Sequence, residues 1–289
     1  MKPFDPRVTP ARADLAARHL QGKVEAARYV SGTECEVTVP TVPMHREPAP
    51  DQPLVSEALL GERVVVYDAD EEGWAWGQLA TDAYVGWLPS AALARPGPEP
   101  THCVRVPRTL VLPTANVRAA PLMAPTLGAR LAIVRLEGRF AVTAAGGYVP
   151  AHHLRALSAR PERDFVTVAE RMLGVPYLWG GRSSLGFDCS GLVQIALGAA
   201  GIRVPRDADQ QEAVLGAAVD VGADLAGVAR GDLVFWPGHV AIVSDPQTLL
   251  HANAWHMMVA LEPLAAAVAR IAAAGAAVRV VRRLPVLGG

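Results

Sequence analysis

The sequence of 289 residues is poor in cysteine: Cys35, Cys103 and Cys189 are the three thiols, and they lie far apart along the chain. At this spacing they make neither a disulfide framework nor a CxxC metal-binding pair, and free thiols fit a reducing cytoplasm. A lone cysteine is by default a small buried hydrophobe. Each thiol must therefore be judged by its surroundings.

The sequence also lacks an excess of either charge and lacks long apolar runs. Charged residues make up 19% of it and the formal net charge is -1, so a nucleic-acid partner is not expected. The first residues, Met1–Pro6, are not followed by the apolar stretch of an export signal, and no run of about 18 apolar residues indicates a membrane span. We expect a soluble cytoplasmic protein with no membrane partner.

The length favours several domains, because ordinary domains have about 100 to 150 residues. Apolar residues recur at roughly helical spacing between residues 9 and 30, which predicts an N-terminal helical segment within residues 1–33. From Glu34 to about Leu154 short β-branched runs are broken by proline and glycine, as in all-β domains.

This β region contains an internal repeat. Each copy has a strand ending in proline, a Leu-Gly strand start and a closing Tyr-Val run; the copies are residues 37–40, 60–66 and 84–89, and residues 104–107, 127–133 and 148–150. The proline-rich stretch Arg95–Pro100 separates them and predicts a linker. The repeat resembles bacterial SH3 domains and predicts two small SH3-like β-barrels, at residues 34–95 and 101–158.

From Arg163 onward the patterns of helices and strands mix. The predicted helices are Phe165–Gly174, Ser190–Ala200 and Leu264–Ala273, and the predicted strands are Asp232–Trp236, His239–Val243 and Val278–Leu284.

Cys189 precedes the second of these helices directly. Backbone N–H groups and the positive end of the helix dipole favour a thiolate at such a position, so we expect a lowered pKa for this thiol. A thiol nucleophile also needs a base, usually histidine. His239 opens an apolar strand, and His251, on the next apolar run, is placed to orient it. The spacing does not favour a metal site, and no metal or other cofactor is expected.

Four motifs in order carry a family resemblance: residues 174–181, 187–193, 230–236 and 238–242 closely resemble the NlpC-type peptidoglycan cysteine peptidases. The resemblance covers about residues 163–289. It implies an α+β, papain-like domain in which a helix carrying cysteine packs on an antiparallel sheet carrying histidine. By matching position, Cys189 is the catalytic nucleophile, His239 the catalytic base and His251 its orienting partner.

With two preceding SH3-like domains, the chain resembles YkfC-type γ-D-glutamyl-L-diamino acid endopeptidases. The resemblance implies cleavage of short murein peptides with a free N-terminal L-alanine, in peptidoglycan recycling. The substrate-binding residues it implies are Tyr177, Trp179, Asp188, Ser190 and Asp207 in the peptidase domain, and Glu57, with Glu62 as alternative, and Tyr84 in the first SH3-like domain. The backbone N–H of Cys189 and the Tyr177 hydroxyl are candidates for stabilising an oxyanion. Ala208 stands where relatives carry serine.

Two other functions stay open at this point. The same Cys-His pair could serve another papain-like amidase or acyltransferase, and the SH3-like domains could belong to an inactive protein that binds wall fragments.

Overall fold

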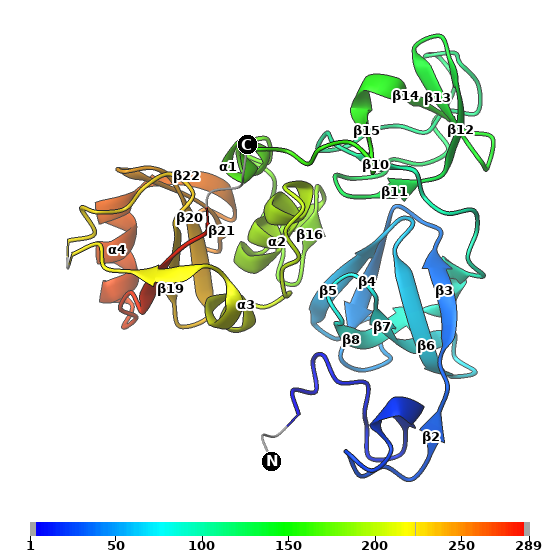
Figure 1. Cartoon of the computed structure of the whole chain (residues 1–289), viewed down its shortest axis with the longest axis horizontal. Helices are drawn as coiled ribbons and strands as arrows, with labels where there is room; N and C mark the ends of the chain where they lie inside the picture. Colours follow the sequence, from blue (N-terminus) through cyan, green and yellow to red (C-terminus); the bar gives the residue numbers. More distant parts are fainter. Residues whose placement is uncertain (1–3, 223, 286–289) are drawn as a thin grey trace. The chain divides into compact units, whose positions relative to one another are not determined.

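A computed structural model describes residues 4–222 and 224–285 of the chain. The chain divides into an N-terminal unit, Met1–Ala159, and a C-terminal unit, Arg160–Gly289 (Figure 1). The division falls close to Arg163, where the sequence predicts that the peptidase domain begins.

The helical segment predicted within residues 1–33 is wrong for the part that the structure describes. Residues Ala16–Ala17 form strand β1, which pairs in parallel with β2, Tyr29–Val30, and the single turn η1, Arg18–Leu20, is a 3-10 helix. Residues 15–17 are all fully buried, whereas a helix on a surface buries residues three or four apart. Leu15 packs against Trp76 and Val85, so tertiary contacts decide the local structure here.

Residues 33–94 form a seven-stranded antiparallel sheet in the order β5-β4-β8-β7-β6-β3-β9. Its strands are β3 (Thr33–Val37), β4 (Thr41–His45), β5 (Leu54–Leu59), β6 (Arg63–Ala69), β7 (Trp74–Leu79), β8 (Val85–Pro89) and β9 (Leu93–Ala94), with the 3-10 turn η2 (Ser90–Ala92) before β9. Val37, Met44, Leu79 and Leu88 are among the buried residues of its core. The residues of the predicted linker, 95–100, lie outside helices and strands, as expected.

Residues 102–156 form two three-stranded sheets around a second core, which includes Val104, Leu131 and Val149. The first sheet has the order β11 (Arg130–Leu131), β10 (His102–Val104), β15 (Leu154–Ala156), and the second has the order β12 (Ile133–Glu137), β13 (Phe140–Thr143), β14 (Tyr148–Pro150), with the turn η3 (Ala151–His153) before β15.

The sequence repeat is confirmed as a structural repeat. The N–H of Gly61 donates to the Val37 carbonyl at 2.9 Å, and the N–H of Gly128 donates to the Val104 carbonyl at 3.0 Å. Both glycines have positive φ, +76° and +88°, where a side chain is disfavoured. The Leu-Gly pairs of the sequence therefore mark one turn that is used twice.

The C-terminal unit is built on a six-stranded antiparallel sheet, in the order β18 (Ala217–Val219), β23 (Val280–Arg283), β19 (Leu233–Trp236), β20 (His239–Asp245), β21 (Thr248–Asn253), β22 (Met258–Pro263). Its helices are α1 (Phe165–Glu170), α2 (Cys189–Ala199), α3 (Ala208–Val214) and α4 (Leu264–Ala273), and a short hairpin is formed by β16 (Arg182–Ser183) and β17 (Gly186–Phe187).

Helix α1 is shorter than predicted. Its α-helical part ends at Glu170 instead of continuing to Gly174. The N–H of Gly174 donates to the carbonyl of Val259, and the N–H of Val259 donates to the carbonyl of Val175. Pairing with β22 therefore draws the chain out of the helix before the glycine.

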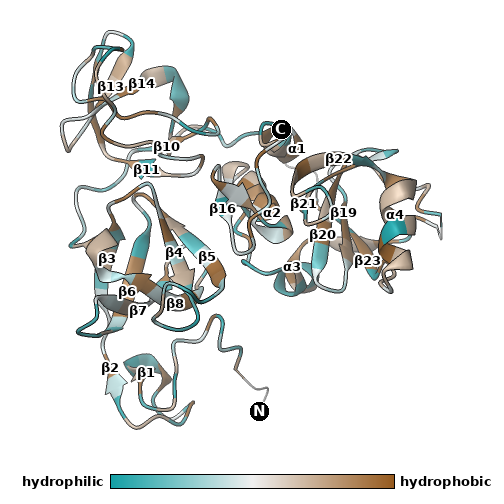
Figure 2. Ribbon diagram, turned by 180° about the vertical axis from the view of Figure 1, so that it is seen from behind, coloured by the Kyte–Doolittle hydropathy of each residue, from teal (hydrophilic) through white to brown (hydrophobic). Residues whose placement is uncertain are grey.

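The sheet of the C-terminal unit buries both faces. Val234, Ala241, Val243 and Leu249 form one core with Leu264 and other residues of α4. Successive residues of a strand point to opposite faces, and α2 packs against β20 and β21. Figures 1 and 2 both show the sheet between α2 and α4, and α2 between β16 and the sheet. The expected arrangement, a helix that carries Cys189 packed on an antiparallel sheet that carries His239, is confirmed.

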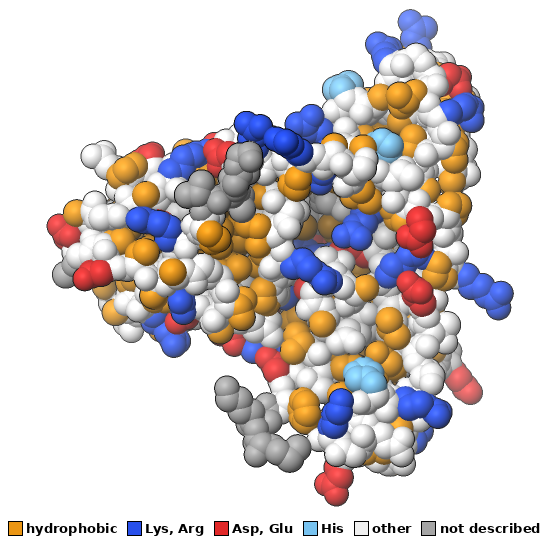
Figure 3. All heavy atoms as spheres, in the orientation of Figure 1, with side chains coloured by type: hydrophobic (Ala, Val, Ile, Leu, Met, Phe, Trp, Pro, Cys, Tyr) orange, Lys and Arg blue, Asp and Glu red, His pale blue; other side chains and the backbone are white. Residues whose placement is uncertain are grey.

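The face of the molecule drawn in Figure 3 carries both charges. Figure 3 shows basic and acidic side chains scattered over the visible face, in line with the formal net charge of -1. Among the described residues, no helix is both long enough and apolar enough to cross a membrane.

Candidate active site

Cys189 is the first residue of α2, and the residue before it fixes the start of that helix. Asp188 is the N-cap: its carboxylate accepts the N–H of Gly191 at 2.7 Å and that of Gly180 at 2.9 Å. An N-cap carboxylate satisfies backbone donors that have no partner inside the helix. The contact with Gly180 also ties the loop before β16 to the helix, which holds the backbone around the cysteine.

Arg206 completes this network from the segment before α3. Its two terminal nitrogens donate to both carboxylate oxygens of Asp188, at 2.9 and 2.7 Å, and one also donates to the Ser190 hydroxyl at 3.0 Å. Asp188, Ser190 and Arg206 are all buried. The predicted substrate contacts Asp188 and Ser190 thus already have partners that hold the start of α2, and substrate binding by these two residues stays a prediction.

His239 and His251 meet on the face of the sheet. Nε2 of His239 lies 2.9 Å from Nδ1 of His251, and the other ring nitrogen of His251, Nε2, lies 3.0 Å from Oε2 of Glu262. His239 opens β20, His251 lies on β21 and Glu262 on β22. The predicted pairing of the two histidines is therefore present, and a carboxylate extends it across a third strand.

Glu262 was not predicted from the sequence. Arg270, in the last turn of α4, donates to both of its oxygens, at 2.9 and 2.7 Å. Glu262 stands alone as an acid in the apolar strand Met258–Pro263, which is a weak signal in the sequence. Its partner could not be inferred, because the contact depends on how β21 pairs with β22.

The expected lowering of the Cys189 pKa is wrong for the free protein. Burial, together with the charge of the neighbouring Asp188 carboxylate, raises the pKa of this thiol to about 12. The N–H groups of Val240 and Ser190 and the charge of Arg206 act in the opposite direction. Burial outweighs them because a lone thiolate would lose most of its hydration.

The two histidines are also neutral near pH 7. Burial, aided by the charge of its neighbour His251, lowers the pKa of His239 to about 3, and burial lowers that of His251 to about 4 against the opposing effect of Glu262. Cys189 and His239 therefore form a neutral thiol and a neutral imidazole at rest. The two charges can arise only together, by transfer of a proton from one to the other.

Several contacts bring the other parts of the site to the thiol. The N–H of Val240, the residue after His239, interacts with the Cys189 sulfur. Tyr177 lies close enough that burial, together with the charges of Cys189 and Asp188, raises its pKa to about 12. The phenol is half-buried and keeps its proton, so it can donate a hydrogen bond.

The remaining predicted substrate residues fall in two places. Within the C-terminal unit, Trp179 is 65% exposed and Asp207 is the N-cap of α3. In the N-terminal unit, Glu57 on β5 and Tyr84 are buried. Glu62 is buried as well and its carboxylate accepts from the N–H of Leu59 and the hydroxyl of Thr81, both at 2.8 Å. The Glu62 carboxylate thus closes a turn between Leu59 and Thr81.

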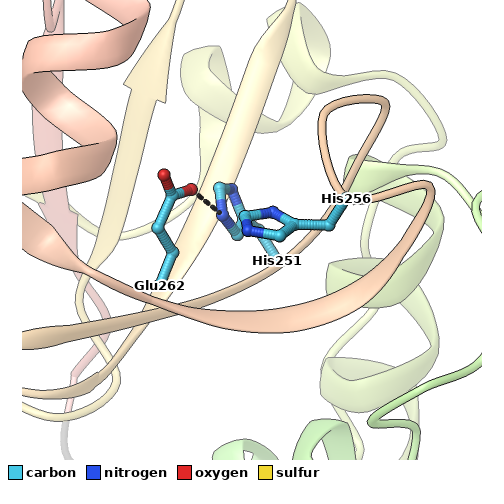
Figure 4. A group of neighbouring side chains, drawn as sticks. All are labelled: His251, His256 and Glu262. Atoms are coloured by element: carbon cyan, nitrogen blue, oxygen red, sulfur yellow. Dashed lines mark hydrogen bonds and ion pairs between the residues drawn. The ribbon is translucent and has the colours of Figure 1, made fainter.

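Among the residues that the structure describes, one group of side chains has the chemistry of metal ligands. Atoms of His251, His256 and Glu262 that could bind an ion lie within 4.8 Å of one another, and Figure 4 shows the Glu262 carboxylate directed at the His251 ring with the ring of His256 beside it. Arg270 already engages both oxygens of Glu262, and its positive charge opposes a cation there. The group fits a hydrogen-bonded chain better than a metal site.

Comparison with known proteins agrees with this geometry. Residues 174–270, which include Cys189, His239, His251 and Glu262, match the model of the NlpC/P60 family, and residues 44–93 match the bacterial dipeptidyl-peptidase SH3 domain. The chain contains an NlpC/P60 domain. The SH3 match covers β5 to β8 of the seven-stranded sheet, whereas the NlpC/P60 match holds Cys189, the two histidines and Glu262.

Curated relatives share parts of the chain. A γ-D-glutamyl-L-lysine dipeptidyl-peptidase of Bacillus subtilis is 27% identical over 198 residues, 64% of this chain and 65% of the relative. The peptidoglycan endopeptidase RipB of Mycobacterium tuberculosis is 31% identical over 151 residues, 45% of this chain and 60% of the relative. The chain thus spans less than two thirds of the length of these relatives.

A solved structure shares the fold. The crystal structure of an NlpC/P60 family protein from Bacillus cereus superposes with a TM-score of 0.73 at 20% identity, covering 88% of this chain and all of that protein. The NlpC/P60 domain has the papain-like fold that the sequence resemblance implies, and an SH3 domain precedes it.

Proposed function

We propose that the protein is a cysteine peptidase that cleaves the γ-D-glutamyl bond to a diamino acid in short murein peptides. The observation that carries this proposal is the placement of Cys189, at the start of α2, against the N–H of Val240, the residue after His239, together with the contact between His239 and His251. The activities of two relatives, a γ-D-glutamyl-L-lysine dipeptidyl-peptidase and a peptidoglycan endopeptidase, support it.

The proposed reaction proceeds through a thioester. His239 accepts the thiol proton of Cys189 while the sulfur attacks the carbonyl carbon of the γ-amide. His239 then gives this proton to the leaving amine, the C–N bond breaks and the diamino acid departs. Water attacks the thioester, with His239 taking one of its protons, and release of the acid returns that proton to the sulfur.

Two donors are suited to the oxyanion that forms during attack. The N–H of Cys189 lies in the first turn of α2, where backbone donors have no intrahelical partner. The Tyr177 hydroxyl keeps its proton and interacts electrostatically with Cys189. Donors held in place before the reaction stabilise developing charge effectively.

We assign recognition of the free N-terminal L-alanine to the first SH3 domain. A match to the SH3 domain of bacterial dipeptidyl-peptidases supports this assignment. A buried ammonium needs a carboxylate partner, and we assign this role to Glu57, which is buried on β5, with Glu62 as the alternative. In the same proposal Tyr84, Trp179 and Asp207 contact the peptide.

We further propose that residues 101–158 are a second SH3-like domain. The support is the repeated hydrogen bonding at Gly61 and Gly128, and the 3-10 turn before the last strand of each copy. The proposed place of action is the cytoplasm, in recycling of wall peptides. The free thiols Cys35 and Cys103 are compatible with a reducing compartment.

The test is hydrolysis of the tripeptide L-Ala-γ-D-Glu-L-Lys and of its diaminopimelate counterpart, followed by mass spectrometry. The wild-type protein should release the diamino acid and the dipeptide L-Ala-D-Glu, Cys189→Ala should release neither, and the control Cys103→Ala should match the wild type. Equal turnover by wild type and Cys189→Ala would contradict the proposal. A product that carries another acyl acceptor would indicate an acyltransferase, and binding without any product would indicate a wall-fragment-binding protein.

The N-terminal selectivity has its own test. N-acetylation of the tripeptide should raise KM strongly for the wild type and little for Glu57→Gln, whereas Glu62→Gln should behave as the wild type where it folds. If the N-acetylated peptide is cleaved as well as the free one, recognition of the amine is contradicted, but the proposed peptidase activity is not.

A further inference from the structure

We infer that Glu262 is a positioning residue: it selects which nitrogen of His251 and of His239 carries the proton, and so leaves Nδ1 of His239 bare to act as the base. The inference rests on the proposed peptidase function. It concerns a line of contacts across three neighbouring strands, from His239 on β20 through His251 on β21 to Glu262 on β22.

The line begins with a group that can only accept hydrogen bonds. Arg270 donates to both oxygens of Glu262, and these contacts lower the pKa of the carboxyl. The side chain is therefore ionised near pH 7, and an ionised carboxylate has no proton to donate. Nε2 of His251, at 3.0 Å from Oε2, must carry the hydrogen.

The position of the hydrogen on His251 then determines the position of the hydrogen on His239. A neutral imidazole has one N–H, so His251 with its hydrogen on Nε2 presents a bare Nδ1. That nitrogen lies 2.9 Å from Nε2 of His239 and can only accept, so Nε2 of His239 carries the hydrogen. The remaining nitrogen of His239, Nδ1, is left with its lone pair.

This order matters because Cys189 is a neutral thiol at rest. The first step needs a lone pair on the nitrogen that takes the thiol proton, and the reversed arrangement of hydrogens would place an N–H there. The two histidines alone do not favour one direction, since either ring can donate to the other. Of the groups beside them, His256 has its Nδ1 at 3.0 Å from Asn253 and its ring centre 6.5 Å from that of His251, and Arg270 bonds to Glu262. The Glu262 carboxylate is the described contact that sets the direction.

The first experiment compares Glu262→Gln with two other variants. An amide has one accepting oxygen, which Arg270 competes for, and its NH2 group can donate to Nε2 of His251 and reverse both rings. We expect kcat on the tripeptide to fall by about tenfold or more, in the range seen for residues that orient functional histidines, with KM unchanged within twofold. Glu262→Asp, which keeps the carboxylate, should recover part of the loss.

The matched control is Asp232→Asn. Asp232 is also buried and is also held by an arginine, with Arg283 donating to both oxygens at 2.7 Å. Its other hydrogen bond within the described residues comes from the N–H of Ala229, so its carboxylate does not act on a histidine. It should lose stability as Glu262→Gln does while kcat per folded molecule stays within twofold of the wild type. A Glu262→Gln protein with wild-type kcat, or an equal fall in kcat for Asp232→Asn, would overturn the inference.

The second experiment needs no substrate. In protein labelled with 15N-histidine, the ring nitrogen shifts of His239 and His251, assigned with His239→Asn and His251→Asn, should show hydrogen on Nε2 and a bare Nδ1 in both rings at pH 7. Hydrogen on Nδ1 of His239 in the wild type would overturn the inference, and this measurement stays decisive where a Glu262 variant does not fold. Because it does not depend on turnover, it also separates failure of this inference from failure of the proposed peptidase function.

Discussion

The NlpC/P60 domain supports its cysteine and its histidine in two different ways. On the helix side, Asp188 and Arg206 hold backbone groups, and the Arg206 side chain is fully buried. On the sheet side, Glu262 and Arg270 hold the ring of His251, and the Arg270 side chain is 25% exposed. The first pair positions a helix start, whereas the second acts on side chains that exchange protons. We therefore expect substitutions on the helix side to lower mainly the stability of the fold, and substitutions on the sheet side to lower mainly the catalytic rate.

The largest effect should come from Arg206→Met. Removal of this arginine leaves the buried Asp188 carboxylate without its cationic partner, which costs about 3–5 kcal/mol in free energy of unfolding. Urea unfolding, followed by hydrogen exchange of peptides from the C-terminal unit, would measure the loss. The control Arg171→Met removes a partly exposed pair with Glu162 and should cost at most about 1 kcal/mol. Equal losses of unfolding free energy in the two variants would mean that the buried ion pair contributes no more to stability than the partly exposed one.

A smaller effect on the helix side should follow Gly191→Ala. An added Cβ would lie 2.2 Å from the carbonyl oxygen of Gly181 and 3.0 Å from Oδ1 of Asp188, so the helix start would have to shift. We expect a loss of about 1–3 kcal/mol and a fall in activity. Gly198→Ala, in the same helix, meets nothing within 4 Å and should gain up to about 1 kcal/mol through helix propensity. A neutral Gly191→Ala would show that the backbone around Cys189 is less closely held than the contacts indicate.

Because two buried histidines lie on the sheet side, we expect the folded protein to lose stability in acid. The folded-state pKa values of His239 and His251, about 3 and about 4, lie below the ordinary 6.5, so between these limits the unfolded chain binds protons that the folded protein does not. Stability is then fully present above about pH 6.5 and falls as the pH falls, by about 1.4 kcal/mol per pH unit for each histidine. His251→Asn should remove part of this slope, and the control His19→Asn, an exposed residue, should not. An unchanged slope in His251→Asn would contradict the neutral, buried state of the ring.

Much of the NlpC/P60 domain could be predicted from local signals. Apolar patterns in the sequence predict the helix that begins at Cys189 and the strand that begins at His239. Both elements are present, and most of their apolar residues are buried. The N-terminal segment shows where such signals fail. Its apolar residues repeat at helical spacing, yet Leu15 and its neighbours are buried by aromatic residues some 60 positions later in the chain. Helix propensity is weak and tertiary contacts outweigh it.

The sequence by itself determined the order of the domains, the repeated turn at Gly61 and Gly128, and the thiol and imidazoles that form the site. These depend on short-range patterns and on residue chemistry. Only the tertiary structure decided which acids and arginines support the site and which groups are charged. Glu262 reaches His251 through strand pairing, Arg206 reaches Asp188 from a later segment, and burial reversed the expected direction of the Cys189 pKa. A helix start favours a thiolate only where water or a cation can share its charge, and removal from water depends on the packing of the whole domain.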